Sequence, residues 1–179
     1  MKLPSNFEAL FTEANRLNLY KKLLSNGSGF GIKIKYIIQK KANGIPEAFL
    51  VSQKYIKNQS VCLMLGDNFI FGNDLYKFLK KGLDNKNGVH FYAYNVQNPE
   101  NYAVLHNRKS KIINIEEKPK NPKTNLAIPG LYFFDKNVVK YCKSLKKSKR
   151  GELEIVDLIK IYIKKKKAKF SKIGRGISW

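Results

Sequence analysis

The feature that most limits how this chain can fold is residues 61–65, a run of five apolar side chains that ends abruptly in Gly66, Asp67 and Asn68. A strand that is apolar at every position needs burial on both faces, and helices on both sides of a mostly parallel sheet provide it. The flanking sequence alternates between helical and strand periodicity. We therefore predict an α/β fold with a mostly parallel central sheet and helices on both faces.

Apolar spacing predicts helices and strands along most of the chain. Apolar residues three and four positions apart predict a helix over residues 7–24 that Gly27 ends, and alternation predicts a strand over residues 32–38. Pro129 and Gly130 interrupt an apolar segment, which indicates a bulge or a close backbone approach to a ligand. The same signals predict helices at about 46–56, 73–83, 136–145 and 152–163, and strands at 89–96, 102–105, 112–117, 126–134 and 170–173.

Length and hydropathy predict one domain without a membrane span. With 179 residues and 43% apolar content, the chain can bury one core, so we expect a single domain over residues 1–179. No apolar run approaches the roughly 18 residues of a membrane span, and no signal-peptide segment follows Met1. We therefore expect a cytoplasmic protein with no membrane partner. Cys62 and Cys142 lie in apolar runs, which predicts packed, reduced thiols and no zinc site.

The formal charge of +22 is the strongest compositional signal, and such a charge is typical of proteins that bind nucleic acids or anionic membranes. Only four of the 35 basic residues are arginine, whereas surfaces that bind phosphates or read bases favour arginine's planar guanidinium. The lysines also spread along the chain. We therefore favour a generally basic surface with no nucleic-acid partner, and a basic nucleic-acid-binding protein is the alternative from another functional class.

Asp67 is the first candidate for chemistry. In an open α/β sheet, ligands bind beyond the carboxyl ends of the strands, and Asp67 lies just past the apolar run, after Gly66. Carboxylate oxygens suit Mg²⁺, which usually accompanies nucleotide phosphates, so Asp67 is a candidate magnesium ligand. The alternative is that Asp67 and Asn68 only form a turn or cap the next helix, and local sequence alone favours this simpler interpretation.

A second group of candidates lies where predicted strands end. Glu116 and Glu117 precede Lys118, and a carboxylate beside an ammonium suits a phosphorylated sugar, because the acid accepts hydrogen bonds from hydroxyls and the lysine neutralises phosphate. Charged residues at a strand end are also often only solvated. Gln39 and Gly44 offer an amide that can pair with a base edge and a backbone that can approach a flat ring, and ordinary loop chemistry explains them equally well.

Short motifs occur along the chain in the order and spacing of a known family. They are LGDN at 65–68, NPENY at 98–102, IEEKPK at 115–120, AIPGLYFFD at 127–135, RGELEI at 150–155 and GRGISW at 174–179. Each motif alone is weak evidence, but together they resemble the sugar-1-phosphate nucleotidyltransferases, and among these the bacterial glucose-1-phosphate thymidylyltransferases, over roughly residues 20–179. The resemblance implies a Rossmann-like nucleotidyltransferase fold and a role in nucleotide-sugar biosynthesis, in the dTDP-rhamnose pathway.

The resemblance also implies substrates and a role for each candidate residue. Gln39 would hydrogen-bond the thymine, and Gly44 would lie against the base. Asp67 would hold Mg²⁺ and Lys118 would contact the sugar phosphate, both as catalytic residues, while the hexose site would be lined by Tyr102, Glu117 and Gly130. The implied reaction is attack of a glucose-1-phosphate oxygen on the α-phosphorus of dTTP, giving dTDP-glucose and pyrophosphate. The full-length enzyme would be a homo-oligomer.

Two parts of the family's catalytic site have no match in this sequence. The family's glycine-rich, arginine-containing phosphate loop lies upstream of the matched residues, and its second metal-binding aspartate lies just beyond Trp179. We therefore expect residues 1–179 to form a partial nucleotidyltransferase domain, without the N-terminal phosphate-loop strand and the C-terminal segment, that has little or no transferase activity alone. A uridylyl- or guanylyltransferase acting on another sugar phosphate is the alternative within the fold.

Overall fold

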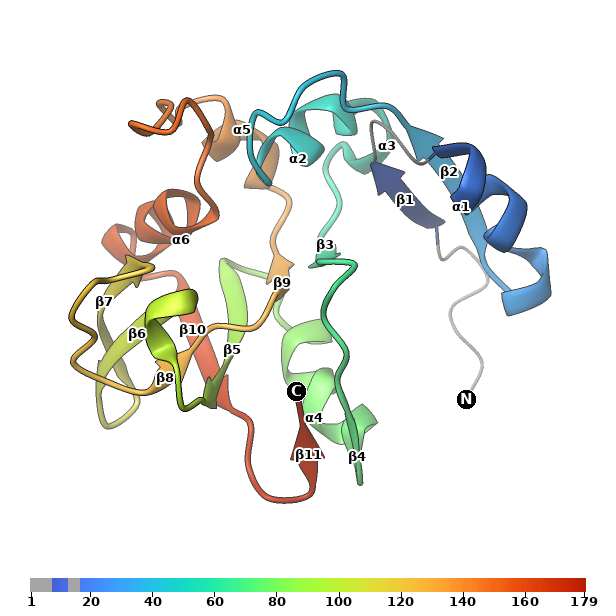
Figure 1. The fold of residues 1–179 in the computed structure, drawn as a ribbon. Coiled ribbons are helices and arrows are strands. Elements are labelled where there is room, and N and C mark those ends of the chain that lie inside the picture. Colours follow the sequence, from blue (N-terminus) through green and yellow to red (C-terminus); the bar gives the residue numbers. More distant parts are fainter. Residues whose placement is uncertain (1–7, 13–16) are drawn as a thin grey trace.

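Apolar strands that are buried on both faces form the centre of the fold. The computed structural model describes residues 8–12 and 17–179, with side chains from residue 17 onward. Its largest sheet has seven strands in the order β3-β9-β5-β8-β6-β7, and β10 pairs with β5 (Figure 1). These strands are β3 (Val61–Met64), β5 (Val89–Asn95), β6 (Ala103–Arg108), β7 (Lys111–Glu117), β8 (Leu126–Ala127), β9 (Leu131–Phe134) and β10 (Ala168–Lys172).

The predicted strand directions are wrong, because this sheet is mostly antiparallel. Every pairing along the order above is antiparallel, and the pairing of β10 with β5 is the parallel one among its described residues. An apolar run indicates that a strand is buried on both faces, but it does not indicate the direction of the neighbouring strands. Helices can cover an antiparallel sheet as well as a parallel one. In addition, β3 lies at one end of the described strand order. Cys62 and Met64 on β3 are exposed, so the expected packing of the thiol holds for the buried Cys142 alone.

Helices on both faces of the sheet are confirmed. Neighbouring residues of one strand contribute to different apolar clusters: Phe91 lies in the larger cluster, whereas Tyr92 lies in the smaller one. The larger cluster includes residues of α2 (Glu47–Val51), α3 (Gln53–Ile56), α5 (Val138–Cys142) and α6 (Ile155–Lys164). The smaller cluster includes Phe78 and Leu79 of α4 (Leu75–Leu83). The sheet therefore separates two apolar cores, each closed by its own helices.

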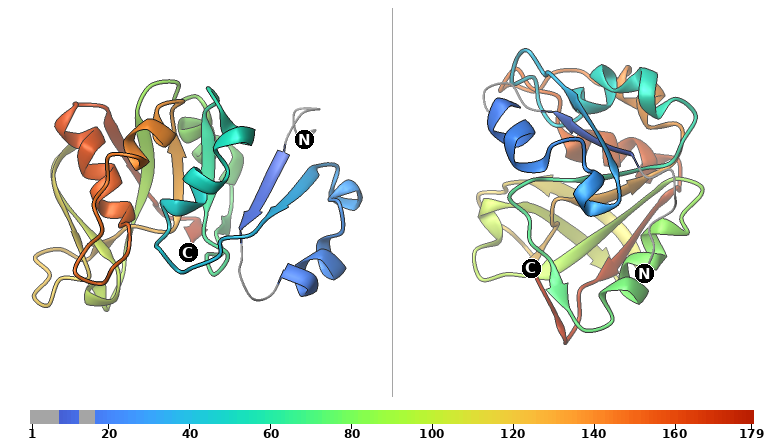
Figure 2. Two further views of the ribbon diagram at one scale, coloured as in Figure 1. Left: turned by 90° about the horizontal axis from the view of Figure 1, so that it is seen from above. Right: turned by 90° about the vertical axis from the view of Figure 1, so that its right-hand side faces the viewer.

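The helix predicted over residues 7–24 is wrong in its first part. Residues 8–12 form β1 (Glu8–Thr12), which pairs in parallel with β2 (Lys33–Ile37), while α1 covers Leu17–Leu24. The remaining residues of the predicted helix, 7 and 13–16, lie outside the described part of the chain. A short apolar segment fits either periodicity, so pairing with a neighbouring strand decides its structure. The unit of β1, β2, α1 and η1 (Ser28–Phe30) lies to one side of the large sheet (Figure 2).

The other predicted elements are present, with boundaries shifted by a few residues. The 126–134 segment divides into β8 and β9 around Pro129 and Gly130, the interruption that the sequence indicated. The short strands β4 (Phe71–Gly72) and β11 (Ile177–Ser178), which the sequence did not reveal, pair with each other, and η2 (Pro99–Asn101) precedes β6. Within the described ranges, none of the helices combines the length and apolarity needed to cross a membrane.

Gly82 lies where α4 packs most closely against the sheet. A methyl group at this position would overlap the Phe133 ring on β9. We expect Gly82→Ala to lower the free energy of unfolding by about 1–3 kcal/mol, because overpacking outweighs the better helix propensity of alanine. Urea denaturation measures this change. Gly29→Ala, whose methyl group meets no atom within 4 Å, is the control, and an equal or higher stability of Gly82→Ala would contradict the packing described.

The buried imidazole of His90 should make the folded protein less stable in acid. Burial lowers the pKa of His90 from 6.5 to about 4, and Lys169 and Lys81 add to this effect. As pH falls from 6.5 toward 4, the unfolded chain binds a proton that the folded chain resists, so the free energy of unfolding should fall by up to about 3 kcal/mol. His90→Gln should remove this part of the pH dependence in denaturation curves at pH 7 and pH 4.5. His106→Gln, the other histidine, should keep it.

Candidate functional site

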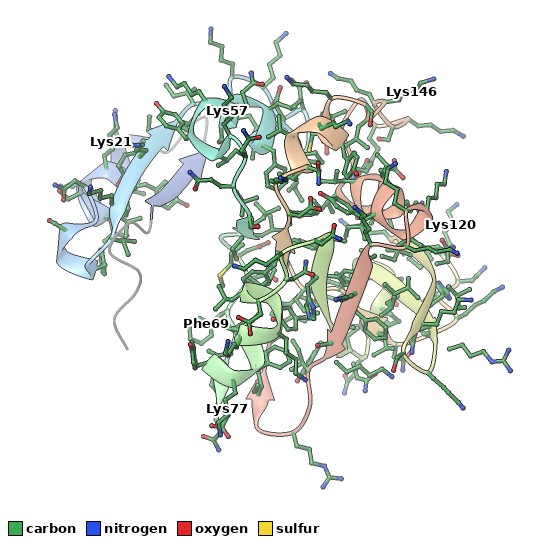
Figure 3. The ribbon with its side chains drawn as sticks, turned by 180° about the vertical axis from the view of Figure 1, so that it is seen from behind. Lys21, Lys57, Phe69, Lys77, Lys120 and Lys146 are labelled. Carbon is green, nitrogen blue, oxygen red and sulfur yellow. The ribbon has the colours of Figure 1, made fainter. Side chains whose placement is uncertain are left out.

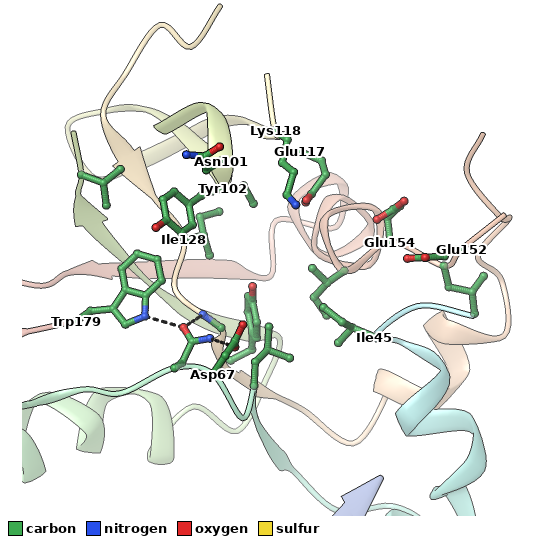
Figure 4. Close-up of a pocket in the computed structure, with 18 of the residues that line it drawn as sticks. Ile45, Asp67, Asn101, Tyr102, Glu117, Lys118, Ile128, Glu152, Glu154 and Trp179 are labelled. Carbon is green, nitrogen blue, oxygen red and sulfur yellow. Dashed lines mark hydrogen bonds between the residues drawn. The ribbon is translucent and has the colours of Figure 1, made fainter. Parts of the chain in front are cut away.

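One pocket of about 640 Å³ brings together five of the seven predicted site residues. Figure 4 shows Asp67 on one wall, opposite Glu117 and Lys118. Tyr102 and Trp179 form one side of the pocket, and Ile45, Glu152 and Glu154 lie on the other. The predicted residues that line this pocket are Asp67, Tyr102, Glu117, Lys118 and Gly130, whereas Gln39 and Gly44 lie outside its lining.

Asn68 organises the wall that carries Asp67. The turn after β3 is fixed by hydrogen bonds from Leu65 N to Gly130 O at 2.8 Å and from Asn68 N to Leu65 O at 3.1 Å. Asn68 Nδ2 donates to Asp67 Oδ1 at 2.7 Å, and Asn68 Oδ1 accepts from Gly130 N at 2.7 Å. The carboxylate of Asp67 is therefore held at the pocket by its neighbour and not by a distant ion pair.

Trp179, the residue that follows β11 (Ile177–Ser178), joins the same group of hydrogen bonds. Its Nε1 donates to Asn68 Oδ1 at 2.7 Å, and its ring meets Tyr102 edge to face with centroids 5.2 Å apart. A methyl group at Gly130 would lie 2.6 Å from Leu65 Cγ and 2.7 Å from Asn68 Nδ2. Only glycine therefore allows the β8–β9 interruption to approach the turn after β3. The result is a pocket wall with two aromatic rings, a surface type that suits the apolar face of a sugar ring.

Glu117 and Lys118 reach the pocket at the end of β7. Lys118 N donates to Tyr102 O at 3.0 Å, and Lys118 has a φ of 42°, an unusual value for a residue with a side chain. This backbone conformation turns the chain out of the strand immediately after Glu117. Burial raises the pKa of Glu117 above its usual value, and the Glu154 carboxylate raises it further, while Arg150 and Lys118 oppose the shift.

Arg150 and Glu154 form a second charged pair in the pocket lining. Arg150 Nη2 lies 2.8 Å from Glu154 Oε2, and Arg150 Nε donates to Glu154 Oε1 at 3.2 Å. Ser148 Oγ also donates to Glu154 Oε1, at 2.7 Å. Although burial acts in the opposite direction, these hydrogen bonds lower the pKa of Glu154. The pocket therefore has two cations, Lys118 and Arg150, next to the two carboxylates Glu117 and Glu154.

Gln39 and Gly44 belong to a loop at the edge of the pocket. Gln39 Nε2 donates to Gly44 O at 3.3 Å, so the amide is used within the loop. The neighbour of Gly44, Ile45, lines the pocket. Gly44 has a φ of 98°, and a methyl group there would overlap the backbone of Leu153. Glycine at this position is therefore explained by close packing of two loops.

The charge distribution distinguishes the pocket from the rest of the surface. Four of the 13 acidic residues line the pocket: Asp67, Glu117, Glu152 and Glu154. The basic side chains, in contrast, do not gather on one face. Lysines labelled in Figure 3 extend from opposite edges of the molecule: Lys21, Lys57, Lys77, Lys120 and Lys146. These lysines thus extend from several edges of the described part of the chain, whereas the four carboxylates share one pocket.

A magnesium ion fits beside Asp67 only if phosphates and water complete its coordination. Among the described residues, no group of three or more His, Cys, Asp or Glu side chains could hold a metal. Mg²⁺ in nucleotide sites commonly takes one or two carboxylates and several phosphate and water oxygens, so a single carboxylate is chemically sufficient. Asp67 is exposed at the pocket, which leaves it accessible to such a metal–phosphate group.

Sequence reasoning missed four residues of this site. Asn68, Trp179, Arg150 and Glu154 all lie in motifs that the sequence analysis identified, but it gave them no role. Asn68 directly follows Asp67, and Trp179 is the single tryptophan, so both carried a detectable signal. The pairing of Arg150 with Glu154 depends on the turn at Gly151, whose φ is 78°, and residue spacing alone does not reveal that turn.

Comparison with known sequences identifies close relatives. Residues 5–179 match the profile of a family described as nucleotidyl transferase. A glucose-1-phosphate thymidylyltransferase from Neisseria meningitidis is 41% identical over 161 residues, which are 89% of this chain and 56% of the relative. Another from Mycolicibacterium smegmatis is 38% identical over the same shares. The chain therefore spans about half the length of the curated relatives it matches.

Comparison with solved structures agrees. A Bacillus anthracis protein described as a glucose-1-phosphate thymidylyltransferase, crystallised with sucrose, superposes with a TM-score of 0.85 at 31% identity. The match covers 94% of this chain and 69% of that protein. A UDP-glucose pyrophosphorylase complexed with UDP-glucose has a TM-score of 0.74 at 17% identity, covering 94% and 73% of the two chains. At that identity the similarity concerns the fold alone, and it agrees with the Rossmann-like nucleotidyltransferase fold expected from the sequence.

Gly130→Ala tests how the pocket wall is built. The added methyl group should displace Asn68 and with it the indole of Trp179, at a cost of about 1–3 kcal/mol in unfolding free energy. Because Trp179 is the single tryptophan, its emission spectrum reports this displacement directly. Gly174→Ala, whose methyl group meets no atom within 4 Å, should leave the spectrum unchanged. Identical spectra for Gly130→Ala and the unsubstituted protein would show that the wall does not depend on this close approach.

Proposed function

The chain belongs to the nucleotidyl transferase family, and on this basis we propose that its pocket binds glucose-1-phosphate for the formation of dTDP-glucose from dTTP. The observation that carries the proposal is that Asp67, from the turn after β3, lines the same pocket as the adjacent residues Glu117 and Lys118 at the end of β7. A carboxylate for sugar hydroxyls, a cation for phosphate and a carboxylate for a metal are the groups that this reaction needs. The names of the relatives at 41% and 38% identity support the same substrates.

The reaction is a displacement at phosphorus. A phosphate oxygen of glucose-1-phosphate attacks the α-phosphorus of dTTP, an O–P bond forms, the bond between the α-phosphorus and the bridging oxygen breaks, and pyrophosphate leaves. In such reactions positioning and electrostatic stabilisation supply most of the catalysis. Lys118 and Arg150 line the pocket and offset negative charge on the sugar phosphate. Asp67 holds Mg²⁺, which neutralises charge on the nucleotide phosphates when it is bound.

Glu117 and the aromatic rings of Tyr102 and Trp179 recognise the hexose. Glu117 accepts hydrogen bonds from sugar hydroxyls, and Tyr102 and Trp179 present rings to the apolar face of the sugar. A partly buried carboxylate suits this task, because a sugar without the matching hydroxyl would leave it unpaired. Gln39 and Gly44 at the pocket edge are on the side where the thymine binds in this proposal. The product would enter nucleotide-sugar biosynthesis, in the dTDP-rhamnose pathway.

Ligand binding and turnover together test the function. Titration of glucose-1-phosphate should change the Trp179 emission and give a saturable heat signal in calorimetry, and dTTP with Mg²⁺ should bind more tightly than UTP. Pyrophosphate release from dTTP and glucose-1-phosphate measures turnover. Binding of glucose-1-phosphate without turnover would support the sugar-phosphate site but not the transfer step. Failure of both ligands to bind would refute the proposal, and preference for UTP would identify the uridylyl alternative.

Lys118→Gln should weaken glucose-1-phosphate binding about tenfold, because a charge-assisted hydrogen bond to phosphate contributes roughly 1.5 kcal/mol or more. Lys120→Gln removes the same charge two residues away, from a side chain that lies outside the pocket lining. It should leave the affinity within about twofold, as expected for an exposed charge. Calorimetry with glucose-1-phosphate at constant ionic strength compares the two variants. Equal losses would mean that Lys118 contributes only to the general positive charge.

A further inference from the structure

Asn43 joins two loops that are distant in the sequence. Its backbone carbonyl accepts a hydrogen bond from Leu153 N at 2.7 Å, and its side-chain Oδ1 accepts one from Lys147 Nζ at 2.9 Å. The first loop, residues 39–45, contains the residues proposed to contact the base. The second, residues 147–154, forms part of the pocket lining and is named the 147–154 arm. Both bonds centre on one residue, so Asn43 fixes the arm against the 39–45 loop.

The two backbones touch directly beside this junction. A methyl group at Gly44 would overlap the backbone of Leu153, so the loops approach as closely as glycine permits. This contact and the bond from Leu153 N to Asn43 O fix the separation of the two segments. Lys147 is exposed, so its hydrogen bond to Asn43 Oδ1 contributes little to stability. The bond mainly orients the arm relative to Asn43. The contacts of Asn43 and Gly44 with Leu153 therefore determine the position of the arm relative to the 39–45 loop.

Asn43 is itself fixed from the opposite side. Its Nδ2 donates to Glu47 Oε1 at 2.7 Å, which ties it to the start of α2 (Glu47–Val51). Glu47 Oε2 is buried without a hydrogen-bond partner among the described residues. The other oxygen of this carboxylate, Oε1, accepts the hydrogen bond from Asn43. Loss of the Asn43 amide would leave a partly buried carboxylate oxygen of Glu47 without this hydrogen bond, which is costly. Asn43 is thus bonded to α2 on one side and to the 147–154 arm on the other.

Hydrogen bonds within the arm connect its residues to one another. Ser148 N donates to Glu152 O at 2.8 Å, and Ser148 Oγ donates to Glu154 Oε1 at 2.7 Å. Arg150 donates hydrogen bonds to the same Glu154 carboxylate from Nε and Nη2. A displacement at Leu153 would consequently carry the guanidinium of Arg150 and the carboxylate of Glu154 with it. Both groups line the pocket that also contains Glu117 and Lys118.

We propose that Asn43 is a positioning residue of the sugar-phosphate site, which holds Arg150 and Glu154 at the pocket through the 147–154 arm. Asn43 is not among the residues that line the pocket, so it acts without touching the ligand. This inference rests on the proposed function, because it assigns the arm to glucose-1-phosphate. It also explains why an asparagine is suited to the position: the side chain donates to Glu47 and accepts from Lys147 at once.

Asn43→Ala is the direct test. We expect it to weaken glucose-1-phosphate binding about fivefold to tenfold in calorimetry, corresponding to the loss of one or two hydrogen bonds. Hydrogen exchange of the peptide covering residues 147–155 should become faster at the same time. Lys147→Met should give a smaller loss of affinity, and Lys146→Met, which removes the same charge one residue earlier, should change neither measurement.

A reciprocal exchange separates positioning from general destabilisation. In the double variant Asn43→Asp with Glu47→Gln, the amide of residue 47 can donate to the carboxylate of residue 43, which still accepts from Lys147. This variant should recover affinity and slow exchange to within about twofold of the unsubstituted protein. A double variant that behaves like Asn43→Ala, or an Asn43→Ala variant that binds normally, would overturn the inference. If the unsubstituted chain binds no glucose-1-phosphate, the proposed function fails first and this inference falls with it.

Discussion

The side-chain amide of Asn68 is the interaction on which the rest of the pocket depends. Its oxygen accepts from both Gly130 N and Trp179 Nε1 at 2.7 Å, and its nitrogen donates to Asp67. One amide thus connects the turn after β3, the interruption between β8 and β9, and the end of β11. These segments are far apart in the sequence, so the pocket wall forms only when all three have come together. Loss of one partner would leave polar groups unsatisfied in a partly buried place, where the cost is high.

The sequence predicted burial well and strand direction badly, for a physical reason. Apolar side chains on both faces of β5 and β9 reflect helices above and below the sheet, and that inference was correct. Side-chain chemistry has no comparable signature for the direction of the neighbouring strand, so the mostly parallel sheet was wrong. The prediction for Glu8–Thr12 was wrong for a different reason: its three consecutive apolar residues fit both a helix and a strand, and pairing with β2 decides between them.

The site was predictable where a functional group lies just past the end of a strand or interrupts a strand. Asp67 after β3, Lys118 after β7 and Gly130 between β8 and β9 were all identified from such positions, and all three line the pocket. Their chemical roles stay predictions. Groups whose placement depends on a turn or on a contact between loops could not be found this way. Arg150 reaches Glu154 because the chain turns at Gly151, and this geometry is set by tertiary structure and not by residue spacing.

The gathering of four carboxylates in the pocket of a molecule with a net charge of +22 has a consequence for kinetics. At distances beyond a few ångströms the summed lysine charge attracts any anion toward the protein, and salt weakens that attraction over a Debye length of about 8–10 Å. Inside the pocket the carboxylates repel an anion, and only an anion that also binds Lys118 and Arg150 can offset this repulsion. Ionic strength should therefore govern how fast anions arrive, while the geometry of the pocket governs which of them remain.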